Sequence, residues 1–269
     1  MIHTKPLEEL LQLCLWTAYL DDEHPQSLLL LSDVEGGKSL LTSQFVDNNG
    51  VIFPHDVTAF GILKVYLKAL KEGKVKHIIL PEFVFPLSRK SETVGTLLAL
   101  LNGLMEEGVR EIQTYATSIS LKKPIYAGVI GCLARDEFAW RKNYWVSIGF
   151  LSRFLPVSYS YSNGTEAAIF DAIFNQAKNC RNINLKFHSG HVILPRDMAV
   201  QLKPLAKKVA GDCSKDKAAR KLAGYRAQIN LQRMAKACAL NREKAVVGQS
   251  EINKIMELGK YINLDYNQL

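Results

Sequence analysis

Short runs of apolar residues alternate with amphipathic stretches over the first 160 or so residues of the chain. Each apolar run has the length of one buried strand. The predicted strands are residues 28–31, 50–53, 76–80, 124–132 and 156–161. Between them, residues 58–72 and 92–107 place apolar side chains at helical spacing. This alternation predicts an α/β fold in which helices cover both faces of a mainly parallel sheet.

The pattern changes after residue 163. Residues 184–194 show no regular period, whereas the flanking stretches read as helices. The predicted helices are residues 166–177, 195–209, 217–240 and 250–260. We therefore predict two units, a core over residues 1–163 and an α-rich domain over residues 164–269. Residues 1–25 of the core hold an N-terminal amphipathic helix.

The composition bounds the class of protein. The chain has 269 residues, of which 48% are apolar and 22% charged, as is typical of a soluble globular protein. It lacks a run of eighteen apolar residues and a basic, then apolar, leader, so we expect no membrane partner. Five cysteines are scattered without metal-ligand spacing, which predicts reduced thiols, no zinc site and a cytoplasmic location.

The positive charge is concentrated in one segment. The net charge is +8, and residues 201–244 alone hold 12 basic and 3 acidic residues. Such a segment favours a polyanionic partner, most simply nucleic acid. The alternative is that these residues form the solvated face of basic helices.

The stretch with the clearest chemistry is residues 32–39, Ser-Asp-Val-Glu-Gly-Gly-Lys-Ser, between the first strand and a helical run. A loop in this setting holds phosphate with its backbone N–H groups, while a lysine reaches the outer phosphates and a following hydroxyl binds magnesium. Lys38 and Ser39 are placed for these two roles, although Ser32 stands where the motif has glycine. The alternative is an ordinary turn with a solvated lysine. The predicted nucleotide-binding residues are Ser32, Asp33, Val34, Glu35, Gly36, Gly37, Lys38, Ser39 and Leu40.

A carboxylate follows the third predicted strand, where a phosphate-loop ATPase holds magnesium and orients the attacking water. The usual pair is Asp-Glu, but here Pro81 precedes Glu82. Glu82 is left to orient water, and metal binding would rely on Ser39 and the phosphates. The alternative is a surface glutamate after a buried strand.

Several local patterns together resemble the minichromosome-maintenance (MCM) helicases and the related MoxR-type AAA+ proteins. Asp33, Lys38 and Ser39 match the MCM loop Gly-Asp-Pro-Gly-x-Ala-Lys-Ser. Residues 57–62 resemble the family's Leu-Thr-Ala stretch, and Leu-Met-Glu-Glu-Gly at residues 104–108 is similar to its Ala-Met-Glu-Glu segment. Further matches are Leu-Ser-Arg-Phe at residues 151–154 and a stretch resembling the lid helix with its sensor-2 arginine at residues 225–237.

The resemblance implies an AAA+ P-loop core with a C-terminal α-helical lid, which binds ATP and Mg²⁺ between subunits of a homo-oligomeric, hexameric ring. It implies that Arg153 is the finger reaching a neighbour's nucleotide and that Arg226 couples the lid to the γ-phosphate. Arg153 could instead form a surface salt bridge, and Arg226 could simply begin a basic helix.

A hairpin is predicted from residues 109–115 and 117–121, which alternate weakly. In the family a hairpin at this place contacts DNA, which assigns Arg110, Lys122 and Lys123 to DNA phosphates. The alternative is that these three charges are solvated turn residues.

The departures from the family keep several functions open. Besides Ser32 and Pro81, no asparagine ends the strand at residues 124–132, and Leu155 replaces the Asp that follows Arg-Phe. The first hypothesis is a DNA-dependent motor, a helicase, translocase or loader that works with other replication or mobile-element proteins. The second is a MoxR-like protein remodeller, and the third is a ring that binds ATP but hardly hydrolyses it. The basic C-terminal half favours the first.

Overall fold

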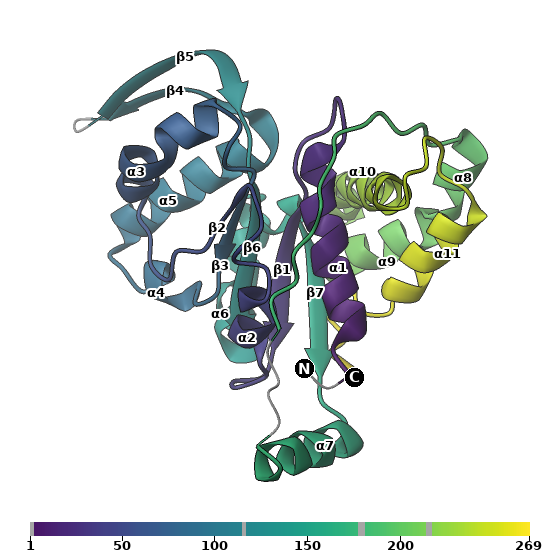
Figure 1. Cartoon of the computed structure of the whole chain (residues 1–269). Coiled ribbons are helices and arrows are strands. Elements are labelled where there is room, and N and C mark those ends of the chain that lie inside the picture. The colour runs from purple at the N-terminus through teal and green to yellow at the C-terminus, as the bar shows by residue number, and fades with distance from the viewer. Residues whose placement is uncertain (1–2, 115–116, 177–180, 214–216) are drawn as a thin grey trace.

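The computed structural model describes residues 3–114, 117–176, 181–213 and 217–269 (Figure 1). Tyr115, Ala177 and Cys180 lie outside them. A six-stranded sheet forms the centre, with the order β2-β3-β6-β1-β7-β8 and parallel pairing throughout. Its strands are β1 Ser27–Ser32, β2 Val51–Ile52, β3 His77–Leu80, β6 Gly128–Ala134, β7 Phe154–Ser160 and β8 Asn267–Gln268.

The first strand lies in the middle of this sheet. β1 pairs with β6 on one side and with β7 on the other, and all six of its residues are buried. A continuous leucine run is what a parallel strand covered on both faces requires. The C-terminal end of β1 therefore opens into a loop at the middle of the sheet edge.

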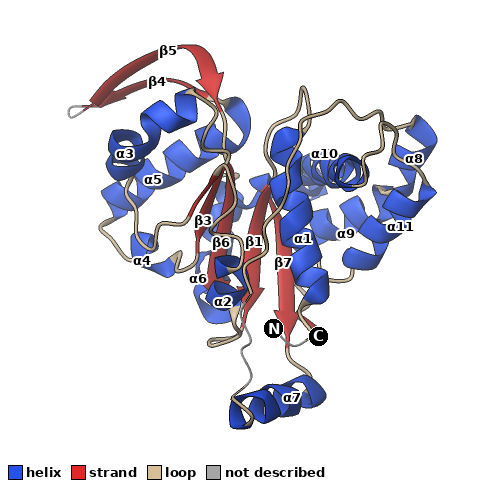
Figure 2. Ribbon diagram, in the orientation of Figure 1, coloured by secondary structure: helices blue, strands red, loops and turns tan. Residues whose placement is uncertain are grey.

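Helices flank the sheet (Figures 1 and 2). α3, α4 and α5 lie on the β2 side, and α1 lies on the β7 side with the C-terminal helices. Thr58 caps α3, because its side chain accepts a hydrogen bond from the Gly61 N–H. The elements of this half are α1 Lys5–Trp16, η1 Thr17–Tyr19, α2 Lys38–Ser43, α3 Ala59–Lys71, α4 Val84–Leu87, α5 Ser91–Asn102, the π-helix η2 Gly103–Glu107, α6 Arg135–Ser147 and η3 Leu151–Arg153.

The predicted hairpin is present, but its second strand is longer than expected. β4 Val109–Thr114 pairs antiparallel with β5 Thr117–Ile125, and the pair extends above α3 and α5 (Figure 2). The single strand expected at residues 124–132 is therefore wrong at its start: β5 ends at Ile125, and β6 begins at Gly128. Gly128 begins a new pairing because its N–H donates to the Lys76 carbonyl ahead of β3.

The C-terminal half is helical, with α7 Asn163–Phe174, α8 Arg196–Gln201, α9 Lys203–Cys213, α10 Lys217–Asn241 and α11 Gln249–Leu258. The helix expected at residues 195–209 is two helices, and Pro204 occupies the first turn of the second, where its missing N–H costs no hydrogen bond. The chain then returns to the sheet, where β8 pairs with β7. The predicted α/β class, a mainly parallel sheet covered by helices with further helices at the C-terminal end, is confirmed. The division at residue 163 stays a prediction.

Two further properties concern the described residues alone. None of their helices combines the length and the hydropathy that a membrane span needs. Their cysteines, Cys14, Cys132, Cys213 and Cys238, are buried free thiols.

Candidate functional site

The loop between β1 and α2 has a tight backbone conformation. Glu35 and Gly37 have positive φ angles of 61° and 72°, in the left-handed region. The Gly36 N–H donates to the Asp33 carbonyl at 3.2 Å, which closes the turn. Glycine at position 37 adopts this conformation without the steric cost that a side chain carries.

Ser32 fits the loop because Gly36 leaves room for it. A Cβ atom at Gly36 would lie 2.2 Å from the Ser32 hydroxyl oxygen, so the two positions share one space. Serine can therefore replace the motif's glycine at position 32, because its hydroxyl occupies the space that a side chain at position 36 would need. That hydroxyl also accepts a hydrogen bond from the Lys38 amine at 2.8 Å.

The Lys38 side chain folds back over the loop. Its Nζ donates to the carbonyl oxygens of Ser32 and Asp33 at 3.3 and 2.7 Å, in addition to the Ser32 hydroxyl. Burial lowers the pKa of the Lys38 amine, and the nearby carboxylates of Glu82 and Asp33 oppose that shift. The amine is therefore a partly desolvated donor that an arriving phosphate can engage.

Ser39 and Glu82 meet at this loop although they lie 43 residues apart. The Ser39 hydroxyl donates to Glu82 Oε1 at 2.7 Å and lies 3.3 Å from the Pro81 carbonyl oxygen. Glu82 follows β3, and Ser39 lies in the first turn of α2 just after β1, so the carboxyl ends of two strands bring them together. Lys38, Ser39 and Glu82 thus form one cluster.

A cavity of about 500 Å³ opens over this cluster. Residues 34–40 line one side, so most of the predicted loop residues face it, whereas Ser32 and Asp33 contact the Lys38 amine instead. The other side is formed by Glu82, Ala134 and Glu137. Ligand pockets commonly have this size. All the described lining residues come from the first 137 residues of the chain.

Two tyrosines that the sequence analysis did not single out hold the loop in place. The hydroxyls of Tyr159 and Tyr161 both donate to the Gly36 carbonyl, at 2.7 and 2.9 Å. Burial raises the pKa of both phenols, so both stay neutral hydrogen-bond donors. Tyr159 is in β7 and Tyr161 directly follows it, and their spacing of two residues places both on one side of the extended chain, beside β1. In the sequence, only this spacing could have indicated that the two tyrosines act together.

Replacing both tyrosines, as Tyr159→Phe with Tyr161→Phe, is expected to weaken nucleotide binding at this loop by roughly 30-fold, because the two lost hydrogen bonds together contribute roughly 2 kcal/mol and about 1.4 kcal/mol is a factor of ten. Titration with a fluorescent ATP analogue measures the effect. Tyr126→Phe at the other edge of the sheet is the matched control. Equal affinity in the double variant and the wild type would show that the two hydroxyls do not order the loop.

Arg135 is a third residue that the sequence analysis did not identify. It follows the end of β6, where the resemblance places a sensor asparagine. One of its guanidinium nitrogens lies 3.7 Å from Asp33 Oδ1, and its guanidinium lies 3.9 Å from the centre of the Tyr266 ring. A cation therefore stands beside the loop in place of the expected amide.

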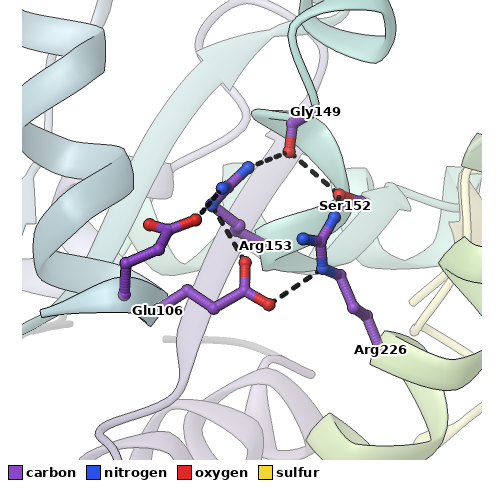
Figure 3. Close-up of polar contacts among 6 residues, drawn as sticks. Glu106, Gly149, Ser152, Arg153 and Arg226 are labelled. Carbon is purple, nitrogen blue, oxygen red and sulfur yellow. Dashed lines mark hydrogen bonds and ion pairs between the residues drawn. The ribbon is translucent and has the colours of Figure 1, made fainter.

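Arg153 and Arg226 meet at a different place, on Glu106 (Figure 3). Arg153 Nε lies 3.1 Å from Glu106 Oε2, and Arg226 Nε donates to Glu106 Oε1 at 2.9 Å. Arg153 also pairs with Glu107, and its Nη1 donates to the Gly149 carbonyl at 2.7 Å. Only 11% of the Arg153 side chain is exposed, so the chain itself holds this arginine.

This arginine cluster lies at the edge of the sheet opposite the loop between β1 and α2. Arg153 directly precedes β7, whereas the loop follows the end of β1, and the two strands are parallel. Arg226 joins Arg153 there, because its Nη1 donates to the Ser152 hydroxyl at 2.8 Å. The structure therefore brings Lys38, Ser39 and Glu82 together and holds Arg153 and Arg226 apart from them.

The three predicted DNA-binding residues lie on the hairpin. Arg110 is in β4, Lys122 and Lys123 are in β5, and all three are exposed. The hairpin leaves the sheet on the edge where β7 begins, away from the loop between β1 and α2 (Figure 1).

No protein-family model matches the chain, and no curated protein matches its sequence. Among solved structures, the chain is similar to a "putative ATPase" from Cytophaga hutchinsonii, with 15% identity and a TM-score of 0.49. The match covers 98% of this chain and 82% of the other. At this level of similarity, function has to be argued from the site itself.

Proposed function

We propose that the protein is an AAA+-type ATPase that hydrolyses ATP at the loop between β1 and α2. The observation that carries the proposal is the 2.7 Å hydrogen bond between Ser39 and Glu82, directly beside the folded-back Lys38 amine. A phosphate-binding lysine, a hydroxyl for the metal and a carboxylate for the water are the parts that phosphoryl transfer to water requires.

The oxygen atoms at this place fit Mg²⁺, because it prefers hydroxyl, carboxylate and phosphate oxygens. Ser39 would hold the ion, which when bound neutralises charge on the phosphates. On ATP binding, the Lys38 amine would exchange the Ser32 and Asp33 carbonyls for phosphate oxygens. Glu82, freed from Ser39, would orient the attacking water through a hydrogen bond and accept its proton as the water attacks.

The site needs a neighbouring subunit. The described residues that line the cavity include no arginine, and Arg153 and Arg226 lie at the opposite sheet edge of the same chain. In an oligomer that stacks these two edges against each other, Arg153 would leave Glu106 for the phosphates of the neighbour's ATP. The resemblance to MCM proteins implies a ring of six for this assembly.

DNA is the substrate class that we propose for the motor. Its support is the exposed basic hairpin and the concentration of positive charge in residues 201–244. Contacts from such residues go to phosphates, so binding would be largely independent of sequence and sensitive to salt.

Changing Arg110, Lys122 and Lys123 to glutamine is expected to weaken DNA binding. The slope of log affinity against log salt should fall by about one for each DNA phosphate that the variant no longer neutralises. Fluorescence anisotropy with a labelled oligonucleotide over a salt series measures both quantities. The control changes three exposed lysines elsewhere, Lys5, Lys74 and Lys90. If both triple variants lose the same affinity, only the net charge matters and the hairpin does not bind DNA.

A second candidate, a ring that binds ATP but hardly hydrolyses it, is favoured by two positions. Pro81 removes one of the usual two carboxylates, and Ala134 ends β6 where a sensor amide is expected. It predicts ATP-dependent assembly with little phosphate release. A MoxR-like remodeller predicts instead phosphate release that DNA leaves unchanged.

A further inference from the structure

Helix α7 stands apart from the body of the protein and exposes apolar side chains. It follows β7 and projects beyond the loop edge of the sheet (Figure 1). Phe170, Ile173 and Phe174 are 59%, 59% and 76% exposed, and Thr165 is the buried residue of the helix. Their spacing of three and four residues places them on one face. An apolar stripe exposed in this way marks a surface for another molecule.

The charge of α7 has one sign. Its sequence contains Glu166 and Asp171 and no basic residue. Glu166 lies four residues before Phe170, on the apolar face, whereas Asp171 flanks that face. The partner surface should therefore be apolar at its centre and positively charged at its rim.

A groove with these properties lies between α8, α9 and α10. Its volume is about 630 Å³, and its apolar lining includes Val200, Ala206 and Tyr225. Arg196, Lys203 and Lys207 supply positive charge, and the described lining residues include no acidic one. Val200 and Tyr225 are both more than half exposed, so the described part of the chain does not fill the groove.

The α7 helix cannot reach the groove of its own chain. The hydroxyls of Ser162 and Thr165 donate to the Leu269 carbonyl at 2.9 and 2.7 Å, and His3 Nδ1 lies 2.9 Å from the Thr165 hydroxyl. These bonds fix the start of the helix at the end of β7, where α7 projects below the sheet in Figure 1, whereas α8, α9 and α10 lie beside β7 among the C-terminal helices. The complementary helix and groove must therefore come from two copies.

We propose that α7 of one subunit docks into the α8–α10 groove of the next subunit. The apolar face of α7 would fill the groove, as an amphipathic helix does in a helix-in-groove complex, and Glu166 and Asp171 would face Lys203 and Lys207. Each subunit offers one helix and one groove, so the contact is heterologous and builds a ring or an open filament. The inference rests on the proposed function, which requires an oligomer, and it identifies the contact through which that oligomer forms.

The test uses two complementary variants. Phe170→Asp with Phe174→Asp disables the helix, and Lys203→Glu with Lys207→Glu reverses the charge of the groove. Because interface anchors carry most of the binding energy, each variant alone is expected to raise the dissociation constant of assembly by on the order of tenfold or more. The changed side chains are exposed, so folding is preserved. Phe60→Asp on α3 is the matched control and should assemble like the wild type.

Mixing the two variants gives the decisive result. The intact helix of the groove variant fits the intact groove of the helix variant, so the mixture is expected to form dimers and nothing larger. Light scattering on a sizing column, with a non-hydrolysable ATP analogue present, measures the size of the assembly. Two variants that stay monomeric when mixed, or that assemble alone like the wild type, would overturn the proposal, as would a wild type that remains monomeric.

Phosphate release, measured on the same samples, separates the two proposals. If the subunits assemble through α7 but release no phosphate, the α7 contact is supported and the ATPase proposal is contradicted. If the α7 variants assemble and release phosphate like the wild type, the ATPase proposal is supported and the α7 contact is contradicted.

Discussion

Replacing Glu82 with glutamine is expected to lower ATP turnover by roughly 10²-fold or more while ATP binding is retained, because the amide cannot accept the proton of the attacking water. Glutamine has nearly the same shape and can still accept a hydrogen bond from Ser39, which the carboxylate does now at 2.7 Å. Steady-state phosphate release and titration with a fluorescent ATP analogue separate turnover from binding.

Glu137→Gln is the matched control for this change. Glu137 lines the same cavity but pairs with Arg141 instead of Ser39, so its variant should retain nearly full turnover. Equal losses in the two variants would mean that charge in the cavity, and not the water-orienting carboxylate at position 82, sets the rate. Full turnover in Glu82→Gln would exclude Glu82 from the chemistry.

Replacing Arg153 with alanine is expected to lower turnover by roughly 10³-fold, since an arginine finger stabilises the charge that develops on the transferred phosphoryl group. ATP affinity should change little, because this residue lies at the sheet edge opposite the phosphate loop of its own chain. Arg153→Lys should not restore turnover, because an ammonium lacks the planar fork of the guanidinium.

The change at Arg153 also removes a partly buried ion pair, so stability has to be followed. Arg233→Ala is the control, because Arg233 is 17% exposed and pairs with Glu23 in a similar way. Both variants should lose similar unfolding free energy in urea, and only Arg153→Ala should lose turnover. If both lose turnover in proportion to stability, Arg153 has a structural role, as the salt-bridge interpretation of the sequence holds.

Local patterns were sufficient to predict the centre of the fold. The four consecutive leucines at positions 28–31 predict a strand that is buried on both faces. The loop that follows is a contiguous motif, so it could be recognised from neighbouring residues alone. The sequence therefore predicted that Lys38 and Ser39 belong to one loop. It also assigned Glu82 to the same site, because phosphate-loop ATPases carry a carboxylate after this strand. The structure brings Glu82 there because the carboxyl ends of parallel strands share one edge of the sheet.

Contacts between distant segments could not be predicted in the same way. Tyr159 and Tyr161 reach Gly36 across more than 120 residues, and nothing in their local pattern names that carbonyl as their acceptor. Glu106 forms ion pairs with Arg153 and Arg226, which lie 47 and 120 residues away along the chain. The sequence therefore contains no sign that the two arginines meet. The break between α8 and α9 depends on one proline inside an otherwise continuous helical pattern.

The most direct test of the account measures phosphate release by a mixture of the Lys38→Ala and Arg153→Ala chains, with and without DNA. Each chain alone should be inactive, since one lacks the phosphate-binding lysine and the other the neighbour's arginine. If the site lies between subunits, random mixing restores about a quarter of the interfaces and hence about a quarter of wild-type turnover, raised by DNA. A mixture as inactive as its components, although the wild type is active, would contradict an intersubunit ATPase site.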